Sequence, residues 1–115
     1  MDNVIQGDNY SVAYDAAAGT VALKGMMRLN GMEEYAPVVG VLSRAANEHQ
    51  AVTLDLRELE FLNSSGIAML SKFVIEARNK QTVALTIRGA KTVAWQGKSL
   101  VNLQRLMPAL SMDIA

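Results

Sequence analysis

The chain has 115 residues, which is the size of a single domain. Half of the residues are hydrophobic and 19% are charged, a balance that argues against intrinsic disorder. Eleven Lys and Arg residues balance eleven Asp and Glu residues, so the basic excess of a typical nucleic-acid-binding protein is absent. With no cysteine and one histidine, His49, a single chain can form neither a disulfide nor a histidine-rich metal site.

The N-terminal segment has neither a basic stretch nor an apolar core, so we expect no secretory signal. Every apolar run is far shorter than the ~20 residues of a membrane-spanning helix, which predicts a cytoplasmic protein without a membrane anchor. Residues 1–115 are expected to form one domain, in which the polar residues 1–8 are poorly ordered.

Hydrophobic periodicity divides the chain into alternating strands and helices. In the helix predicted at residues 65–79, the apolar stripe includes Ile67 and Leu70, and Met69 adjoins it. Pro37 is expected in the first turn of its helix, since a proline further along removes a backbone hydrogen bond. In chain order, the pattern predicts strands at residues 10–14 and 20–29, a helix at 33–49, a strand at 52–56, a helix at 65–79, a strand at 83–88, a helix at 98–107 and a strand at 110–114.

This order contains three β-α-β steps in succession, which form a largely parallel sheet with right-handed crossovers. We therefore predict an α/β fold with a mixed, mostly parallel sheet of about four to five strands and three main helices. In such sheets the functional surface lies beyond the carboxyl ends of the parallel strands. Three loops, at residues 30–32, 62–66 and 89–97, are predicted to meet there.

The central loop is the most informative part of the sequence. Asn63, Ser64 and Ser65 precede an apolar helix, and each can cap it by accepting a hydrogen bond from an unpaired helix N–H. A well-capped helix start is the simplest interpretation. The two hydroxyls also lie where the free N–H groups and the helix dipole favour an anion.

Residues 52–56 (VTLDL) and 61–67 (FLNSSGI) resemble the signature of STAS domains, most closely that of the anti-sigma-factor antagonists. That signature reads hydrophobic-Asp-Leu, then Phe-x-Asp-Ser-Ser-Gly-Leu. The resemblance implies a STAS-like fold whose first serine after the Asp is phosphorylated by a partner that is both anti-sigma factor and serine kinase. By position, Ser64 is the phosphoacceptor, Ser65 is the neighbouring hydroxyl, and Gly66 allows close approach. Asn63 stands where the family usually has Asp, and residues 95–99 (WQGKS) do not match the family pattern.

These residues suggest an on/off binding switch. A phosphate adds roughly −1.5 to −2 charge at neutral pH, and a partner packed against Ser64 would have to face that charge. We therefore expect a non-enzymatic, partner-switching regulator of transcription without a cofactor or metal of its own. The expected partners are a serine-kinase anti-sigma factor, which supplies the nucleotide, and a phosphatase. The predicted contact surface includes, besides residues 63–66, Asn30, Gly31, Met32, Met69, Lys72 and Trp95.

Several other residues carry alternative interpretations. Residues 95–99 end like a phosphate-binding P-loop, but the glycine required five positions before Gly97 is Thr92, which argues against nucleotide hydrolysis. Trp95 either contacts a partner or folds back over the core. Asp55 is expected to be structural rather than catalytic, and Lys72 is expected to form a solvated pair with Glu76.

The sequence is also compatible with two other functions. The same helix N-terminus could bind a small ligand or an anion without covalent modification. The chain could also be a scaffold subunit that self-assembles, although a monomer or weak homodimer is expected. No histidine or carboxylate has a spacing to the serines that implies a catalytic triad, so no enzymatic activity is predicted.

Overall fold

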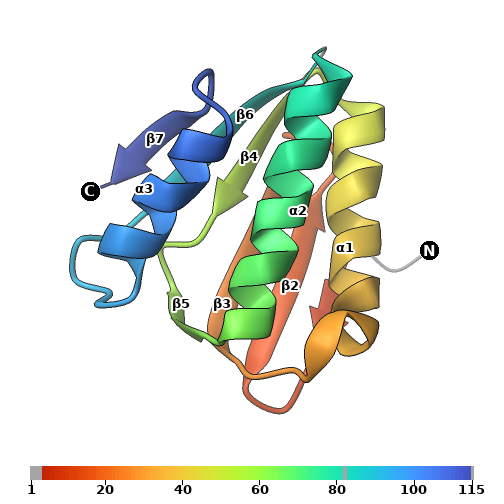
Figure 1. Ribbon diagram of the computed structural model, residues 1–115. Helices are drawn as coiled ribbons and strands as arrows, with labels where there is room; N and C mark the ends of the chain where they lie inside the picture. The colour runs from red at the N-terminus through yellow and green to blue at the C-terminus, as the bar shows by residue number, and fades with distance from the viewer. Residues whose placement is uncertain (1–3, 82, 115) are drawn as a thin grey trace.

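The computed structural model describes residues 4–81 and 83–114 (Figure 1). Its strands and helices follow the predicted α/β alternation, with two additional short strands, β1 and β5. In chain order the elements are β1 Val4–Gln6, β2 Tyr10–Asp15, β3 Thr20–Met27, α1 Gly31–Glu48, β4 Ala51–Asp55, β5 Leu59–Leu62, α2 Ser64–Lys80, β6 Ala84–Gly89, α3 Gln96–Leu106 and β7 Ser111–Ile114.

The strands form one mixed sheet in the order β1-β2-β3-β4-β6-β7, and β5 pairs with β3 outside this path. The β1–β2 and β2–β3 pairs are antiparallel, and the four other pairs are parallel. The prediction of a mostly parallel sheet with three helices is therefore confirmed, but the described sheet has seven strands rather than four or five. Within the segment 1–8 that was predicted to be poorly ordered, Val4–Gln6 form β1, where Ile5 pairs with Val12, and residues 1–3 lie outside the described part.

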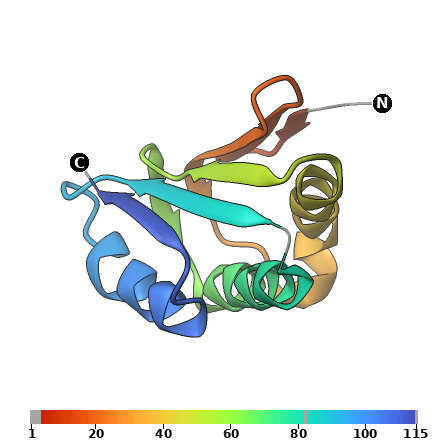
Figure 2. The same ribbon diagram turned by 90° about the horizontal axis from the view of Figure 1, so that it is seen from above.

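All three helices cover the same face of the sheet and leave its other face open (Figure 2). The core fills the space between the two layers because each helix turns one apolar side towards the sheet. Its largest fully buried side chains include Tyr35 and Leu42 from α1, Phe73 from α2 and Leu23 from β3. None of the helices in the described ranges is long and apolar enough to cross a membrane.

Helix α1 begins two residues before its predicted start, and this changes the position of Pro37. The proline lies inside the helix, beyond the first turn, so the expectation of a first-turn proline is wrong. Its side chain is exposed, so the ring is accommodated on the solvent side. At the start of the same helix, the Glu34 carboxylate reaches back and accepts a hydrogen bond of 2.9 Å from the Asn30 N–H. This contact orders the loop that leads from β3 into α1.

Candidate functional site

Two loops meet where the parallel strands β3 and β5 end. Met27 and Leu62, the last residues of these strands, are register partners. The chain then turns into α1 after β3 and into α2 after β5 (Figure 1). The Gly31 N–H donates a hydrogen bond of 3.3 Å to Ser65 Oγ, which joins the two helix starts directly. We call residues 63–66 the switch turn.

Asn63 holds the switch turn in place with both ends of its side-chain amide. Its Oδ1 accepts hydrogen bonds from the Tyr35 hydroxyl (2.7 Å) and from the Gly66 N–H (3.0 Å), so Asn63 is the N-cap of α2. Its Nδ2 donates to the Leu29 carbonyl at 2.7 Å. An Asp side chain would accept the first two bonds but could not donate the third when ionised. The departure from the family pattern at this position therefore has a local structural reason.

Tyr35 and Gly66 pack closely beneath the turn. The Tyr35 side chain is fully buried, and this burial raises the pKa of its phenol, so the hydroxyl remains a donor to Asn63 at neutral pH. A Cβ added at Gly66 would lie 2.2 Å from Leu62 Cδ1 and 2.7 Å from the Tyr35 hydroxyl oxygen. Only glycine lets α2 start this close to the end of β5 and to Tyr35.

The two serines of the turn have different surroundings. Ser64 is the first residue of α2 and is exposed, whereas Ser65 is half-buried and its Oγ accepts the bond from Gly31. A second protein can therefore reach the Ser64 hydroxyl without disturbing the packing. Removing Ser65 Oγ would remove the direct hydrogen bond between Gly31 and the turn.

The other predicted contact residues divide into exposed and buried ones. Asn30, Gly31 and Lys72 are exposed, and Met32 is only half-exposed because it packs against the core. Met69 is completely buried, so its prediction as a surface contact is wrong. The reason is the orientation of α2, whose buried residues are Gly66, Met69, Leu70, Phe73, Val74 and Ala77.

The expected ion pair on α2 is replaced by a contact between helices. Glu76 accepts a hydrogen bond of 3.3 Å from the Ser43 hydroxyl on α1. In the part of the chain that the structure describes, no ion pair joins Glu76 to Lys72. Lys72 is exposed on α2.

Trp95 lies against the beginning of β5. Its indole Nε1 donates to the Leu59 carbonyl at 2.8 Å, and the half-buried ring packs on the core. No hydrogen bond among the described residues joins Trp95 to residues 63–66. Of the three loops that were predicted to meet, the structure connects the first two by a direct hydrogen bond.

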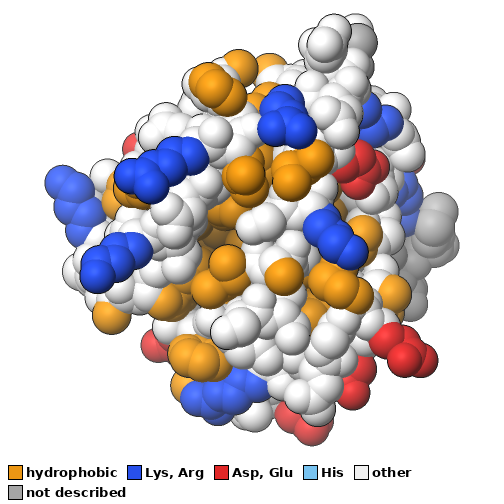
Figure 3. All heavy atoms as spheres, in the orientation of Figure 1, with side chains coloured by type: hydrophobic (Ala, Val, Ile, Leu, Met, Phe, Trp, Pro, Cys, Tyr) orange, Lys and Arg blue, Asp and Glu red, His pale blue; other side chains and the backbone are white. Residues whose placement is uncertain are grey.

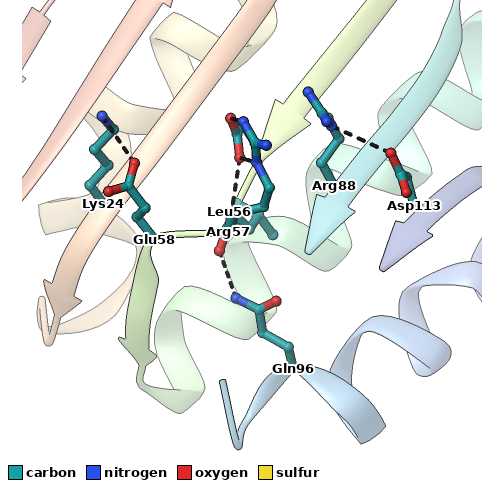
Figure 4. Close-up of polar contacts among 8 residues, drawn as sticks. Lys24, Leu56, Arg57, Glu58, Arg88, Gln96 and Asp113 are labelled. Carbon is teal, nitrogen blue, oxygen red and sulfur yellow. Dashed lines mark hydrogen bonds and ion pairs between the residues drawn. The ribbon is translucent and has the colours of Figure 1, made fainter. Parts of the chain in front are cut away.

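Gln96 is a buried polar residue that the sequence did not single out. Its Nε2 donates to the Leu56 carbonyl at 2.6 Å (Figure 4). Its Oε1 accepts from the Ala90 N–H at 2.8 Å. The Gln96 amide thereby ties the start of α3 to the backbone between β4 and β5, where the Leu56 carbonyl also accepts from the Leu59 N–H at 3.0 Å, and to the backbone after β6. The segment that ends like a P-loop is thus the anchored start of α3.

Charged side chains pair around the carboxyl end of β4, on the sheet face that the helices leave open (Figure 4). The Arg57 guanidinium donates two hydrogen bonds, of 2.9 Å and 2.7 Å, to the Asp55 carboxylate. Lys24 pairs with Glu58 at 3.2 Å, and Arg88 pairs with Asp113 at 3.5 Å. Within residues 4–81 and 83–114, no three His, Asp or Glu side chains gather as a possible metal site.

The Asp55–Arg57 pair predicts a pH-dependent contribution to stability. The hydrogen bonds from Arg57 hold the pKa of the Asp55 carboxyl below its usual value of 3.8. A lowered pKa in the folded state stabilises the fold above pH 3.8, and this contribution is lost as the pH falls through the folded pKa. We expect Asp55→Asn to cause a small loss of stability at pH 7 that shrinks towards pH 3, measured by urea unfolding. A loss of equal size at both pH values would contradict this assignment.

Comparison with known proteins confirms the predicted α/β class of the fold. Neither a family model nor a curated protein matches the chain. Among solved structures, it resembles a chain in the complex of the diguanylate cyclase SiaD with its activator SiaC from Pseudomonas aeruginosa. The TM-score is 0.74 and the identity 18%, over 99% of this chain and 100% of that chain.

Two further structures, both of SiaC from Pseudomonas aeruginosa, are also similar to this chain. The apo-SiaC crystal structure matches with a TM-score of 0.74 and 18% identity, over 99% of this chain and 98% of that chain. Another SiaC structure matches with a TM-score of 0.70 and 19% identity, over 100% of this chain and 96% of that chain. At this level of identity, the similarity establishes the fold.

Proposed function

We propose that this chain is a non-enzymatic regulator that binds a protein partner over the switch turn and is released by phosphorylation of Ser64. The observation that carries this proposal is the contrast between an exposed Ser64 and the fixed residues around it. Asn63 and Gly66 are locked into the fold, so a kinase finds the Ser64 hydroxyl on a preformed surface. Phosphorylation then changes the charge of that surface without requiring the chain to unfold.

The position of Ser64 favours survival of the fold after phosphorylation. The new charge of roughly −1.5 to −2 would lie at the N-terminus of α2, where a negative charge is stabilised. At an exposed helix N-terminus this stabilisation is worth ~0.3–1 kcal/mol. A bound partner would have to desolvate the phosphate or oppose it with its own charges. Binding is therefore lost while the regulator remains folded.

The proposed contact surface extends along two elements from the switch turn. Asn30 and Gly31 lie beside it, because Gly31 is bonded to Ser65. On α2, the exposed residues Ser64, Ala68 and Lys72 recur every four positions and so lie on one side of the helix. As the STAS resemblance implies, we propose a serine-kinase anti-sigma factor as the partner and a phosphatase that restores binding.

Phosphorylation of Ser64 is tested by substitution and by mass spectrometry. We expect the immobilised wild-type chain and Ser64→Ala to retain a kinase partner. Immobilised Ser64→Asp should recover at least ten-fold less of that partner. Ser111→Asp, at an exposed serine on β7, adds the same charge away from the turn and is expected to bind normally. Incubation with the partner and ATP should place the phosphate on Ser64. A phosphate elsewhere with Ser64 unmodified, or equal recovery by Ser64→Asp, would overturn the proposal.

A second candidate is activation of a diguanylate cyclase. It is favoured by the match over nearly the whole chain to a structure of a cyclase with its activator SiaC. The same switch turn would then control an enzyme instead of an anti-sigma factor. Adding the purified chain to a diguanylate cyclase from the same organism tests this, because an activator raises cyclase activity and Ser64→Asp should not. Cyclase activity that is the same with and without the chain would exclude this function.

A further inference from the structure

The charges of the chain are unevenly distributed along the sequence although they cancel overall. Residues 77–112 contain no Asp or Glu, so the balancing acids lie almost entirely in the first part of the chain. Such asymmetry often marks an interaction surface for a partner of opposite charge. The basic residues of this segment, which runs from the end of α2 through β6 and α3, are Arg78, Lys80, Arg88, Lys91, Lys98 and Arg105.

An apolar groove lies within this basic part, between α3 and β7. Its volume is about 300 Å³, and its walls are formed by Leu100, Val101 and Gln104 on α3 and by Met112 and Ile114 on β7. Val101 is 49% exposed and adjoins the other apolar side chains of this groove, so its exposure belongs to a continuous apolar surface. Figure 3 shows hydrophobic side chains next to Lys and Arg side chains over α3.

Two of the basic residues border the groove on the solvent side of α3. Lys98 precedes Val101 by three positions, and Arg105 follows it by four, so all three lie on neighbouring parts of one helix side. Lys98 and Arg105 are both exposed, and neither forms an ion pair with any described residue. The groove is thus an apolar surface with an uncompensated positive rim.

The opposite wall of the groove is an edge of the sheet. β7 is the last strand of the sheet order and pairs with β6 alone among the described strands. Its outer N–H and C=O groups are therefore free to pair with another extended segment. Because side chains alternate along a strand, Met112 and Ile114 point to the groove while Ser111 and Asp113 point to the open face. An added strand would place every second side chain over the groove.

We propose that this groove binds an extended, acidic segment of a partner protein, which adds as a strand to β7. Its apolar side chains would pack on Val101, Met112 and Ile114, and its carboxylates would pair with Lys98 and Arg105. The apolar walls disfavour a nucleic-acid backbone, which needs polar and basic contacts along its length. A second copy paired through its own β7 would bring its basic rim against this one, and like charges repel.

The proposal is tested by selecting partners from a displayed library of random 12-residue peptides on the immobilised full-length chain. We expect the selected peptides to alternate apolar residues with Asp and Glu, and their synthetic versions to bind more weakly as salt concentration rises. Val101→Glu and the double variant Lys98→Glu/Arg105→Glu should each weaken binding at least ten-fold. All three positions are exposed, so the substitutions leave the core intact.

Val4→Glu is the matched control. Val4 is 54% exposed on β1, at the other edge of the sheet, so the same substitution there should leave peptide binding unchanged. Ser64→Asp should also bind the peptides normally, which separates this groove from the switch turn. Peptides without acidic residues, or binding that survives Val101→Glu, would overturn the proposal. Dimers in sedimentation experiments that Val101→Glu abolishes would instead assign the groove to a second copy.

Discussion

Replacing Gly66 with alanine is expected to lower the free energy of unfolding by about 2–3 kcal/mol, because the added methyl group has no space. Its carbon would lie 2.2 Å from Leu62 Cδ1 and 2.7 Å from the Tyr35 hydroxyl oxygen. Tyr35 cannot retreat, since its ring is fully buried and its hydroxyl is bonded to Asn63. Chemical denaturation of wild type and Gly66→Ala measures the difference directly.

Gly40→Ala is the matched control for this experiment. Gly40 lies within α1, and a Cβ added there would meet no atom within 4 Å. Alanine favours a helix interior over glycine by ~1 kcal/mol, so Gly40→Ala should be neutral or stabilising. A loss of unfolding free energy for Gly66→Ala together with a gain for Gly40→Ala would show that close packing under the switch turn, and not helix propensity, determines the change at Gly66. Similar small effects at both positions would contradict the close packing.

The helices and long strands could be predicted from the sequence because each repeats its pattern over several turns or alternations. The two short strands could not. β1 contains three residues and β5 four, and neither is long enough to establish an alternation that a loop lacks. The pairing of β5 also depends on a strand distant in sequence, since Leu62 is the register partner of Met27 on β3.

The orientation of α2 shows a second limit of pattern analysis. Ile67 and Met69 are both apolar, so the sequence allows either to face the core. In the fold, Met69 is completely buried and Ile67 is half-buried, because the helix starts close to the sheet at Gly66. That close approach depends on Tyr35 and Leu62, which come from other elements. The sequence pattern identifies the apolar side of a helix but does not fix its rotation about its axis.

The position of the candidate site could be predicted from the sequence, but the contacts that hold it in place could not. The Asn-Ser-Ser-Gly run marked the turn, and strand order predicted that residues 30–32 would lie beside it. The contacts of Asn63 with Tyr35 and with the Leu29 carbonyl span 28 and 34 residues of sequence, so no local pattern indicates them. The same holds for Gln96 and the Leu56 carbonyl, which lie 40 residues apart.

Substitution of Asn63 is also expected to lower the free energy of unfolding strongly. Different substitutions remove different members of the three hydrogen bonds that the Asn63 side chain makes. Asn63→Asp keeps an acceptor for Tyr35 and Gly66 but removes the donor to Leu29, which should cost about 1–3 kcal/mol of unfolding free energy. Asn63→Ala also removes the helix cap and the partner of the buried Tyr35 hydroxyl, so its loss should be about 3 kcal/mol or more. In denaturation experiments the free energy of unfolding should therefore be highest for wild type, lower for Asn63→Asp and lowest for Asn63→Ala.

Tyr35→Phe provides the control that tests the central bond of this network. The single substitution leaves Asn63 bonded to Gly66 and to the Leu29 carbonyl, so its cost should be about 1 kcal/mol. Asn63→Ala alone leaves the buried Tyr35 hydroxyl without its partner. The double variant Tyr35→Phe/Asn63→Ala lacks that hydroxyl. The combined loss should therefore fall short of the sum of the two single losses by about 1 kcal/mol. Additive losses would mean that the Tyr35–Asn63 bond does not stabilise the turn. The rigid surface around Ser64 would then depend on the packing of Gly66 and on the bonds of Asn63 to Gly66 and to the Leu29 carbonyl.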